Sequence, residues 1–284
     1  MEKDKYSKDN IAILYEHPEW FKPLFSILDR NNIQYTPIKA HSSFFDVQDQ
    51  NFPYSILFNR LSPSAHTRGN IASIFYGSQY LYYLENLGVR IINGYKSHDY
   101  EFSKAKQLNL LNSLGIKYPK ARVINDVSKI LKASEGLMFP IIIKPNVGGS
   151  GAGILKFNTK KELKEFVKLN SLNMGIDHTA LVQEYLPARN NSVVRIEILN
   201  EQFLYAIKLH LESEDTFNLC PADYCDIQEK NTKSTKDGVS ERRLLIESYK
   251  PANDVKEKVK RITKNAGIEV GGVEYLINDR DGEL

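Results

Sequence analysis

The sequence predicts an α/β (α+β) protein with a βαβ unit at the N-terminus and a longer unit after it. Three observations lead to this prediction. Short apolar segments alternate with amphipathic helices over residues 1–95. A glycine-rich loop separates two strand-like segments within 139–157, and a turn signal at Asn200 separates two more. Alternating strands and helices are typical of a parallel sheet covered by helices.

The N-terminal unit contains four expected strands and two expected helices. The strands are 11–16, 33–38, 54–59 and 89–93, and the helices are 18–31 and 77–88. In the first helix, one face carries the apolar residues Trp20, Leu24, Phe25 and Leu28. Gly88 ends the second helix. We expect residues 1–95 to form one domain and 96–284 another, with lobes at 96–180 and 181–284.

The longer unit mixes helices with strands. Ser103 is an expected N-cap for a helix at 103–115, and Thr159 with Glu162 forms a capping box for a later helix. Further helices are expected at 126–135 and 255–267. Strands are expected at 139–144, 153–157, 180–186, 193–199, 202–211 and 273–278. The polar segment 227–243 is expected to be a loop.

The bulk composition excludes several function classes. A net charge of +3, from 38 basic and 35 acidic residues, gives no argument for binding to nucleic acid or to an anionic membrane. The two cysteines, Cys220 and Cys225, lack the spacing of a redox or zinc motif. The polar start MEKDKYSKDN has no apolar signal region, and no apolar run approaches the length of a bilayer span. We expect a cytoplasmic protein and leave homo-oligomerisation open.

The strongest functional signal is FPIIIKPNVGGSGAGILKF, residues 139–157. A P-loop requires a lysine after the glycines, and the dinucleotide fingerprint requires GxGxxG; neither is present. A glycine loop between two strands can instead act as a flap whose backbone N–H groups cover phosphates. Lys144 ends the incoming strand, where it could reach such phosphates. Taken alone, the loop is equally compatible with a plain flexible hairpin.

Four segments in order resemble the ATP-grasp superfamily, and within it the RimK-like carboxylate–amine ligases. HDYEFSKAKQLNLLNSLGIKYPKARVI resembles the first nucleotide-binding helix, and FPIIIKPNVGGSGAGI resembles the strand, lysine and flap. ALVQEYLP resembles the strand between the lobes, and NAGIEVGGVEYL resembles the unit that carries a metal-binding acid. The resemblance runs from about residue 90 to the end. It implies an ATP-grasp fold preceded by a βαβ pre-ATP-grasp domain.

The resemblance also implies a nucleotide site, a catalytic group and a metal ligand. Arg195 is expected to stabilise the developing acyl phosphate, and Glu274 to bind Mg²⁺. The residues expected to bind ATP are Lys104 and Lys144 at the phosphates, Gly148, Gly149, Ser150, Gly151 and Gly153 in the flap, and Gln183, Glu184, Tyr185 and Leu186 at the adenine hinge. The structural alternatives are a solvated helical lysine, an ordinary buried strand and, for Arg195, a surface cross-strand ion pair.

Some positions extend this pattern or depart from it. Residues 59–69 lie where such proteins often bind the second substrate, and Lys208 and His210 share a strand face that could line the cleft. Val193 stands where close relatives often carry an acid. The family's returning strand after Glu274 carries an acid-x-Asn pair, whereas this sequence ends two residues after an Asp281–Gly282 turn. We therefore expect a truncated chain with an incomplete metal site.

The predicted function is an ATP-dependent ligase that joins a carboxylate to an amine through an acyl phosphate and releases ADP and phosphate. ATP and Mg²⁺ are the expected cofactors, and the resemblance implies amino-acid or peptide-like substrates. The alternative is a nucleotide-binding module or pseudoenzyme without catalysis. A structural or interaction protein is the third class considered.

Overall fold

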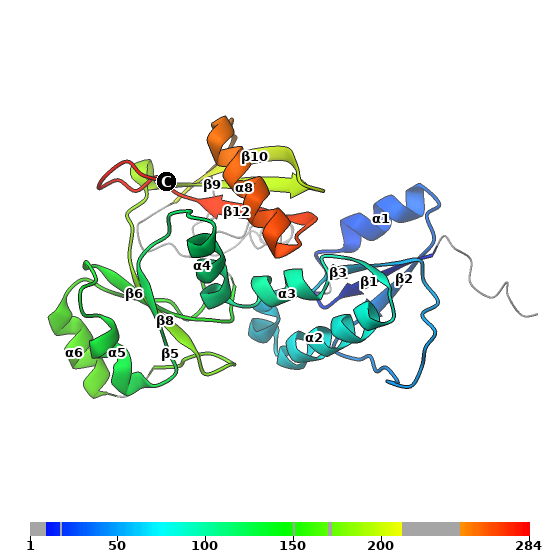
Figure 1. Cartoon of the computed structure of the whole chain (residues 1–284), viewed down its shortest axis with the longest axis horizontal. Helices are drawn as coiled ribbons and strands as arrows, with labels where there is room; N and C mark the ends of the chain where they lie inside the picture. Colours follow the sequence, from blue (N-terminus) through cyan, green and yellow to red (C-terminus); the bar gives the residue numbers. More distant parts are fainter. Residues whose placement is uncertain (1–9, 18, 150, 170–171, 212–244) are drawn as a thin grey trace, which may run out of the picture.

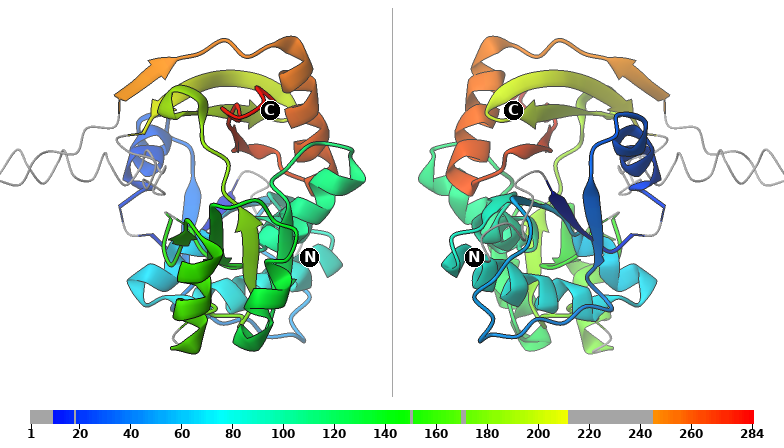
Figure 2. Two further views of the ribbon diagram at one scale, coloured as in Figure 1. Left: turned by 90° about the vertical axis from the view of Figure 1, so that its left-hand side faces the viewer. Right: turned by 90° about the vertical axis from the view of Figure 1, so that its right-hand side faces the viewer.

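The computed structural model describes residues 10–17, 19–149, 151–169, 172–211 and 245–284. Within these ranges the strands form three sheets of four strands each, ordered β2-β1-β3-β4, β5-β8-β6-β7 and β11-β10-β9-β12 (Figures 1 and 2). In the part of the chain so described, no helix is long and apolar enough to cross a membrane. The predicted α/β class is confirmed. The three sheets, each covered by helices, surround one central region.

The first sheet is entirely parallel, as the βαβ rhythm predicts. Its elements are β1 (Ile11–Tyr15), α1 (Lys22–Arg30), β2 (Tyr35–Lys39), β3 (Ile56–Arg60), α2 (Ile71–Asn86) and β4 (Arg90–Ile92). Successive residues of a strand point to opposite faces. Tyr15 accordingly contacts Phe25 of α1, with ring centroids 5.4 Å apart, whereas Leu14 packs in the cluster formed with α2. The two helices thus cover opposite faces of the sheet.

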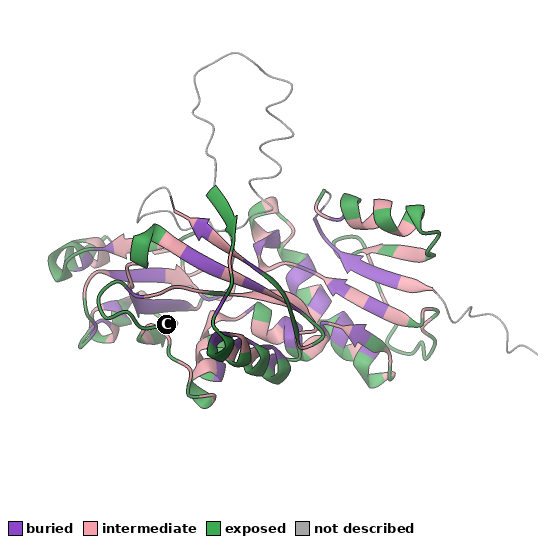
Figure 3. Cartoon of the chain, turned by 90° about the horizontal axis from the view of Figure 1, so that it is seen from above, coloured by how far each residue is buried: buried purple, intermediate pink, exposed green. Residues whose placement is uncertain are grey.

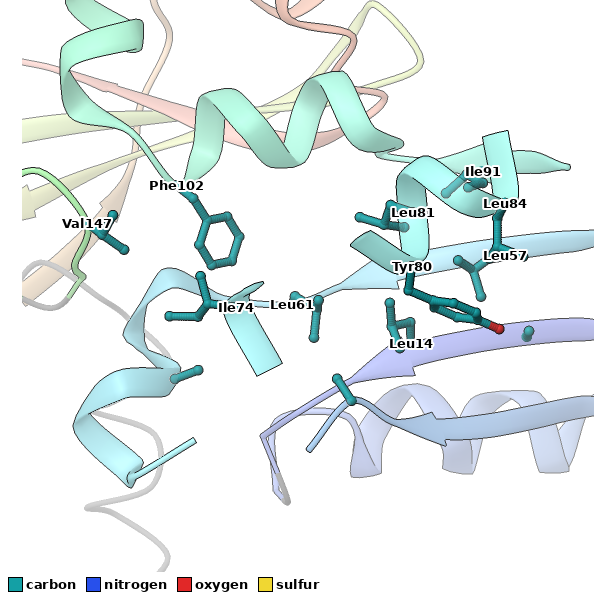
Figure 4. Close-up of a cluster of buried hydrophobic side chains, with 13 residues drawn as sticks. Leu14, Leu57, Leu61, Ile74, Tyr80, Leu81, Leu84, Ile91, Phe102 and Val147 are labelled. Atoms are coloured by element: carbon teal, nitrogen blue, oxygen red, sulfur yellow. The ribbon is translucent and has the colours of Figure 1, made fainter. Parts of the chain in front are cut away.

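The core of this first unit extends into the next one. Leu14 and Leu57 of the sheet are fully buried and pack in one cluster with the fully buried Leu81 of α2. The same cluster contains Phe102 and Val147, which lie far along the chain (Figure 4). Phe102 directly precedes the helix expected to carry a phosphate-binding lysine, and Val147 directly precedes the glycine loop. Apolar burial therefore fixes the start of both functional segments against the N-terminal sheet.

The second sheet carries the glycine loop. Its elements are α3 (Tyr95–Glu101), α4 (Lys104–Ser113), β5 (Ala121–Ile124), α5 (Ile130–Ala133), β6 (Ile141–Pro145), β7 (Leu155–Phe157), α6 (Lys160–Lys168) and β8 (Ala180–Glu184). β6 pairs antiparallel with both β7 and β8, so the loop joins a true hairpin. The Thr159 side chain accepts a hydrogen bond from the Glu162 N–H at 3.2 Å, as the capping box predicts.

The third sheet supplies the opposite wall of the molecule. Its elements are β9 (Ser192–Leu199), β10 (Gln202–His210), β11 (Leu245–Ser248), α8 (Asn253–Ala266) and β12 (Val270–Tyr275). Asn200 and Glu201 have φ of 47° and 62°, which suits the two-residue hairpin turn expected there. β9 lies between β10 and β12, and buried residues gather along it (Figure 3). α8 covers one face with Val255 and Val259.

Several element boundaries differ from the sequence expectations. α2 begins at Ile71 instead of residue 77, because Ile74 is buried in the first core. α3 was not expected at all. β12 spans Val270–Tyr275 instead of the expected 273–278, so Gly271 and Gly272 lie inside a strand. After β12 the Asp281–Gly282 turn is present, and the Gly282 N–H donates to the Asn278 carbonyl at 2.8 Å.

Some expectations fall on residues outside the described ranges. These are Pro18 of the first expected helix, Ser150 of the flap, Cys220 and Cys225, and the loop at 227–243. The division of the chain at residue 95 into two domains stays a prediction.

Asn93 joins the first sheet to the third. Its side chain donates to the Val270 carbonyl at 2.6 Å and accepts from the N–H groups of Glu269 and Val270 at 2.9 and 3.1 Å. Its own carbonyl accepts from the Asn59 side chain at 2.8 Å. Asn93 is 5% exposed and has a φ of 55°, a conformation that asparagine tolerates better than most residues.

We expect Asn93→Ala to lower the free energy of unfolding by roughly 2–4 kcal/mol, because buried backbone groups of β12 lose their partners. Chemical denaturation measures this change. Asn32→Ala is the matched control, since Asn32 has a φ of 54° but is exposed. Equal losses in the two variants would show that backbone strain alone, and not the hydrogen bonds between sheets, explains the effect.

Candidate functional site

A cavity of about 520 Å³ lies where the three sheets meet. Trp20, Ser62, Pro63 and Ser64 line it from the first unit, and Val193 lines it from β9. The residues expected to bind ATP, metal or substrate that also line it are Lys104, Lys144, Gly149, Gly151, Gln183, Glu184, Tyr185, Leu186, Arg195 and Glu274. Gly148 and Gly153 belong to the same loop but are not among the lining residues.

Two lysines occupy one wall of this cavity. Lys104 begins α4, and its Nζ donates to the Gly148 carbonyl at 2.8 Å. Burial lowers the pKa of Lys104 to about 8, although Asp177 opposes the shift. Burial also lowers the pKa of Lys144 to about 8, and Lys104 adds to that shift. Two neighbouring ammonium groups whose charged forms are disfavoured form a site suited to a polyanion.

Asn146 positions this wall and was missed by sequence reasoning. Its Oδ1 accepts from the Ala105 N–H at 2.9 Å and the Ser103 hydroxyl at 3.2 Å. Its Nδ2 donates to Asp177 at 2.7 Å, and its carbonyl accepts from Lys104 Nζ at 3.2 Å. Asn146 therefore fastens the N-terminus of α4 to the end of β6. Only its place between Lys144–Pro145 and the glycines could have indicated it.

The glycine loop approaches the first unit closely. A Cβ added to Gly149 would lie 3.2 Å from Ser64 Cβ, and one added to Gly148 would lie 3.5 Å from His66 Cε1. Gly153 has a φ of 75°, where a side chain would be strained and would meet Pro145 Cγ at 3.0 Å. Glycine at 149 thus lets the loop backbone lie against the short helical turn Pro63–Arg68.

The hinge between the second and third sheets follows β8. The Glu184 side chain accepts from the Met138 N–H at 2.9 Å, and the backbone N–H groups of Glu184 and Tyr185 donate to Lys120 and Pro140 carbonyls at 2.9 Å each. These groups are therefore already engaged. Gln183 is 6% exposed, and its buried Oε1 has no hydrogen-bond partner among the described residues. A ligand with a donor group could satisfy it.

Arg195 lies at the centre of a charged cluster on the third sheet. Its Nε donates to Glu197 at 2.6 Å, and its Nη1 donates to Glu274 at 3.0 Å on the adjacent strand β12. Burial alone would lower the pKa of Arg195, but the two carboxylates raise it well above its usual value. Among the residues described, no group of three His, Cys, Asp or Glu side chains could hold a metal ion. Glu274 is instead one carboxylate within reach of a cavity ligand.

Two expected cleft residues lie elsewhere. Lys208 and His210 of β10 both pair with Glu247 of β11, at 3.2 and 3.1 Å, and neither lines the cavity. The cross-strand pairing explains this, because both side chains share the face of β10 that points toward Glu247. By contrast, the expected second-substrate stretch 59–69 does contribute to the lining. Trp20 and Glu101 line the cavity without having been predicted.

The comparisons with known proteins agree with this architecture. Residues 102–219 match the RimK-like ATP-grasp domain. A RimK domain ATP-grasp protein from Sphaerobacter thermophilus superposes with a TM-score of 0.66 at 13% identity, over 95% of this chain and 87% of that one. The ATP-grasp ligase PsnB, solved with a minimal precursor, gives 0.64 at 17% identity, over 96% and 87%. The predicted ATP-grasp fold and the resemblance to RimK-like proteins are confirmed.

Sequence similarity to curated proteins is confined to part of the chain. A probable alpha-L-glutamate ligase 1 from Shewanella denitrificans is 27% identical over 137 residues, which is 47% of this chain and 45% of that protein. The chain thus spans less than half the length of the curated relatives that it matches.

Gly272 leaves room for the Arg195 cluster. A Cβ there would lie 2.7 Å from Arg195 Nη2 and 2.8 Å from Glu197 Oε1. We expect Gly272→Ala to fold, to lose about 1–3 kcal/mol of unfolding free energy, and to turn Arg195 away from its carboxylates. A crystal structure and chemical denaturation test both. Gly148→Ala, where a Cβ meets its nearest atom at 3.5 Å, is the control. Arg195 unmoved in the variant would contradict the expectation.

Proposed function

Starting from the RimK-like ATP-grasp domain in residues 102–219, we propose that this protein is an ATP-dependent carboxylate–amine ligase. The observation that carries the proposal is the pair Lys104 and Lys144 on one cavity wall beside the glycine loop. Both ammonium groups are disfavoured by burial, and Lys104 disfavours the charge of Lys144. A bound polyphosphate would offset the repulsion between the two ammonium groups. The backbone of the glycine loop would supply N–H donors to the same phosphates.

The hinge residues fit an adenine ring. The buried Gln183 Oε1 requires a donor. Leu186 lines the cavity, and its N–H has no acceptor among the described residues. Adenine offers both an exocyclic amino donor and ring nitrogen acceptors. Because the Glu184 and Tyr185 N–H groups are engaged elsewhere, we assign adenine recognition to Gln183 and Leu186 within the predicted hinge.

Side chains of the third sheet would contact the terminal phosphate of the nucleotide, where the reaction takes place. Glu274 is a carboxylate of the kind that Mg²⁺ prefers, and Mg²⁺ commonly takes one or two such ligands and completes its shell with phosphates and water. When bound, the ion supplies charge that offsets the phosphates. Arg195, held by Glu197 and Glu274, presents a fixed guanidinium to oxygens that gain negative charge during the reaction.

The reaction follows from this placement. The terminal phosphoryl group moves to an oxygen of the substrate carboxylate, and ADP leaves. The amine nitrogen then attacks the acyl carbon, the C–N bond forms, and phosphate leaves while the nitrogen loses a proton. This chain's residues bind, orient and neutralise charge, so no protein nucleophile is required. A cytoplasmic location, where ATP is available, is part of the proposal.

We propose amino acids or peptides as substrates. The support is indirect: PsnB was solved with a precursor, and curated relatives are probable glutamate ligases. The first unit lines part of the cavity with Trp20, Ser62 and Ser64. A second substrate would lie there.

A second candidate is nucleotide binding without catalysis. The observation that favours it is the 3.0 Å bond between Glu274 and Arg195, which engages the expected metal ligand. Calorimetry with ATP, with and without Mg²⁺, separates the two functions. A gain in affinity with Mg²⁺ supports the ligase, whereas affinity independent of Mg²⁺ supports the alternative.

The ligase proposal predicts ADP release that depends on two partners. N-acetylated amino acids offer a carboxylate without an amine, and amino-acid amides offer an amine without a carboxylate. We expect at least one pair, or a short peptide in place of either member, to stimulate ADP release and to give an amide detectable by mass spectrometry. If no pair does so, the protein is not this ligase.

Nucleotide binding should also take up protons near pH 8. In the free protein Lys104 and Lys144, with pKa values of about 8, are partly neutral at that pH. Bound phosphate favours their charged forms and raises both pKa values, so protons enter on binding. Uptake should vanish near pH 6, where both are already charged. Calorimetry in buffers of different ionisation enthalpy measures it.

Lys144→Met should reduce this uptake and weaken ATP binding roughly 10- to 100-fold, as expected for loss of a charged hydrogen bond. Exposed Lys164 on α6 provides the matched control, Lys164→Met. Proton uptake that is the same in wild type and Lys144→Met would remove Lys144 from the phosphate site.

A further inference from the structure

Glu101 stands out among the cavity residues because nothing assigned so far uses it. It is the last residue of α3, and its side chain lines the cavity, so the surface that it keeps accessible lies among the cavity walls. The next residue, Phe102, is 7% exposed and packs in the first core beside Ile74 and Val147 (Figure 4). Phe102 also stacks on His98, with ring centroids 4.0 Å apart. The backbone that carries Glu101 is therefore anchored on both sides of the helix end.

The Glu101 carboxylate has no direct partner in the described part of the chain, whether by hydrogen bond or ion pair. Its neighbours are engaged elsewhere. Arg195 is held by Glu197 and Glu274, and the Arg60 guanidinium lies 5.6 and 5.3 Å from the ring centroids of Phe21 and Phe58. By contrast Asp99, on the same helix, pairs with Lys106.

This placement is unfavourable for a carboxylate. Glu101 ends a helix, where the negative pole of the backbone dipoles lies. The cavity walls desolvate the group and raise its pKa to about 7, although Arg60 and Arg195 lower it. Residues that violate local preferences without a structural partner are expected at functional sites. An unpaired carboxylate facing a cavity calls for a cationic or proton-donating ligand.

The ligands of the proposed reaction differ in charge. ATP and the substrate carboxylate are anions, and they match Lys104, Lys144 and Arg195. The amine substrate is the one that enters as a cation. Glu101 and Arg195, the group proposed to face the activated acyl oxygen, line the same cavity. An amine held at Glu101 would thus share this cavity with the activated acyl group.

We propose that Glu101 is a catalytic residue that binds the ammonium group of the amine substrate and takes a proton from it, which frees the nitrogen lone pair for attack. The inference rests on the proposed ligase function. In the step, one proton passes from the ammonium nitrogen to the Glu101 carboxylate, and the neutral nitrogen then uses its lone pair to bond to the acyl carbon. The bond from that carbon to the phosphate oxygen breaks, and phosphate leaves with its electron pair and takes up the second proton that the nitrogen loses.

The test compares two nucleophiles with one carboxylate, an N-acetylated amino acid. Hydroxylamine is neutral near pH 7 and gives a hydroxamate, whereas an amino-acid amide enters with an ammonium group and gives an amide. For Glu101→Gln, kcat/KM for the amino-acid amide should fall roughly 10²-fold or more, the scale of general-base catalysis. Its KM for that amine should rise, while hydroxamate formation should stay at the wild-type rate.

Asp99→Asn is the matched control, because Asp99 lies on α3 but pairs with Lys106 outside the cavity. It should leave both rates unchanged, and thermal melts should show that both variants fold. Equal loss of both rates in Glu101→Gln, or loss of neither, would overturn the inference and leave the ligase function standing. If the wild type forms no hydroxamate and no amide, the ligase function fails, and this inference fails with it.

Discussion

The hydrogen bonds of the Asn146 side chain are the constraint on which the site depends. A buried amide can bond at several positions at once, and this one joins the start of α4, the end of β6 and Asp177. Lys104 and the glycine loop are thereby held in one frame, even though 42 positions separate Lys104 from Asn146. Removal of such an amide would leave buried N–H and C=O groups without partners, and that is usually more harmful than loss of the bond itself.

Each of the three sheets brings a different kind of polar or charged group to the cavity. The second sheet and α4 bring ammonium groups whose burial disfavours their charge, while the third sheet brings a guanidinium balanced by two carboxylates. The first unit contributes mainly hydroxyl and aromatic groups. A ligand with a polyphosphate end and a reactive end would therefore meet different electrostatic surroundings at its two ends. Such a difference suits the proposed transfer between two ligand groups better than storage of an anion.

Local signals in the sequence were sufficient for most of the described strands, the hairpin and most lining residues, although β5 and β11 were missed. The spacing of Lys144 and the glycines indicated the loop, and Gln183 to Leu186 end an apolar segment that stops at proline. The starts of α2 and β12 were misplaced, because burial of Ile74 and the space beside Arg195 override local propensity. Asn146 and Glu101 were missed for the same kind of reason: their roles depend on neighbours that only the folded chain brings near.

The bonds of Asn93 bear on how such proteins can be recombined. A chimera of two relatives would exchange the N-terminal sheet as one segment, with a fusion point near residue 95. Yet Asn93 accepts from and donates to the start of β12, and Arg90 pairs with Glu269 in the same place. The strand that carries Glu274 is thus bonded at its start to residues that the exchanged segment would contain. A chimera that keeps the acceptor's residues 269–270 but imports residues 90–93 must match both sides of these contacts, or β12, and Glu274 with it, will be out of place.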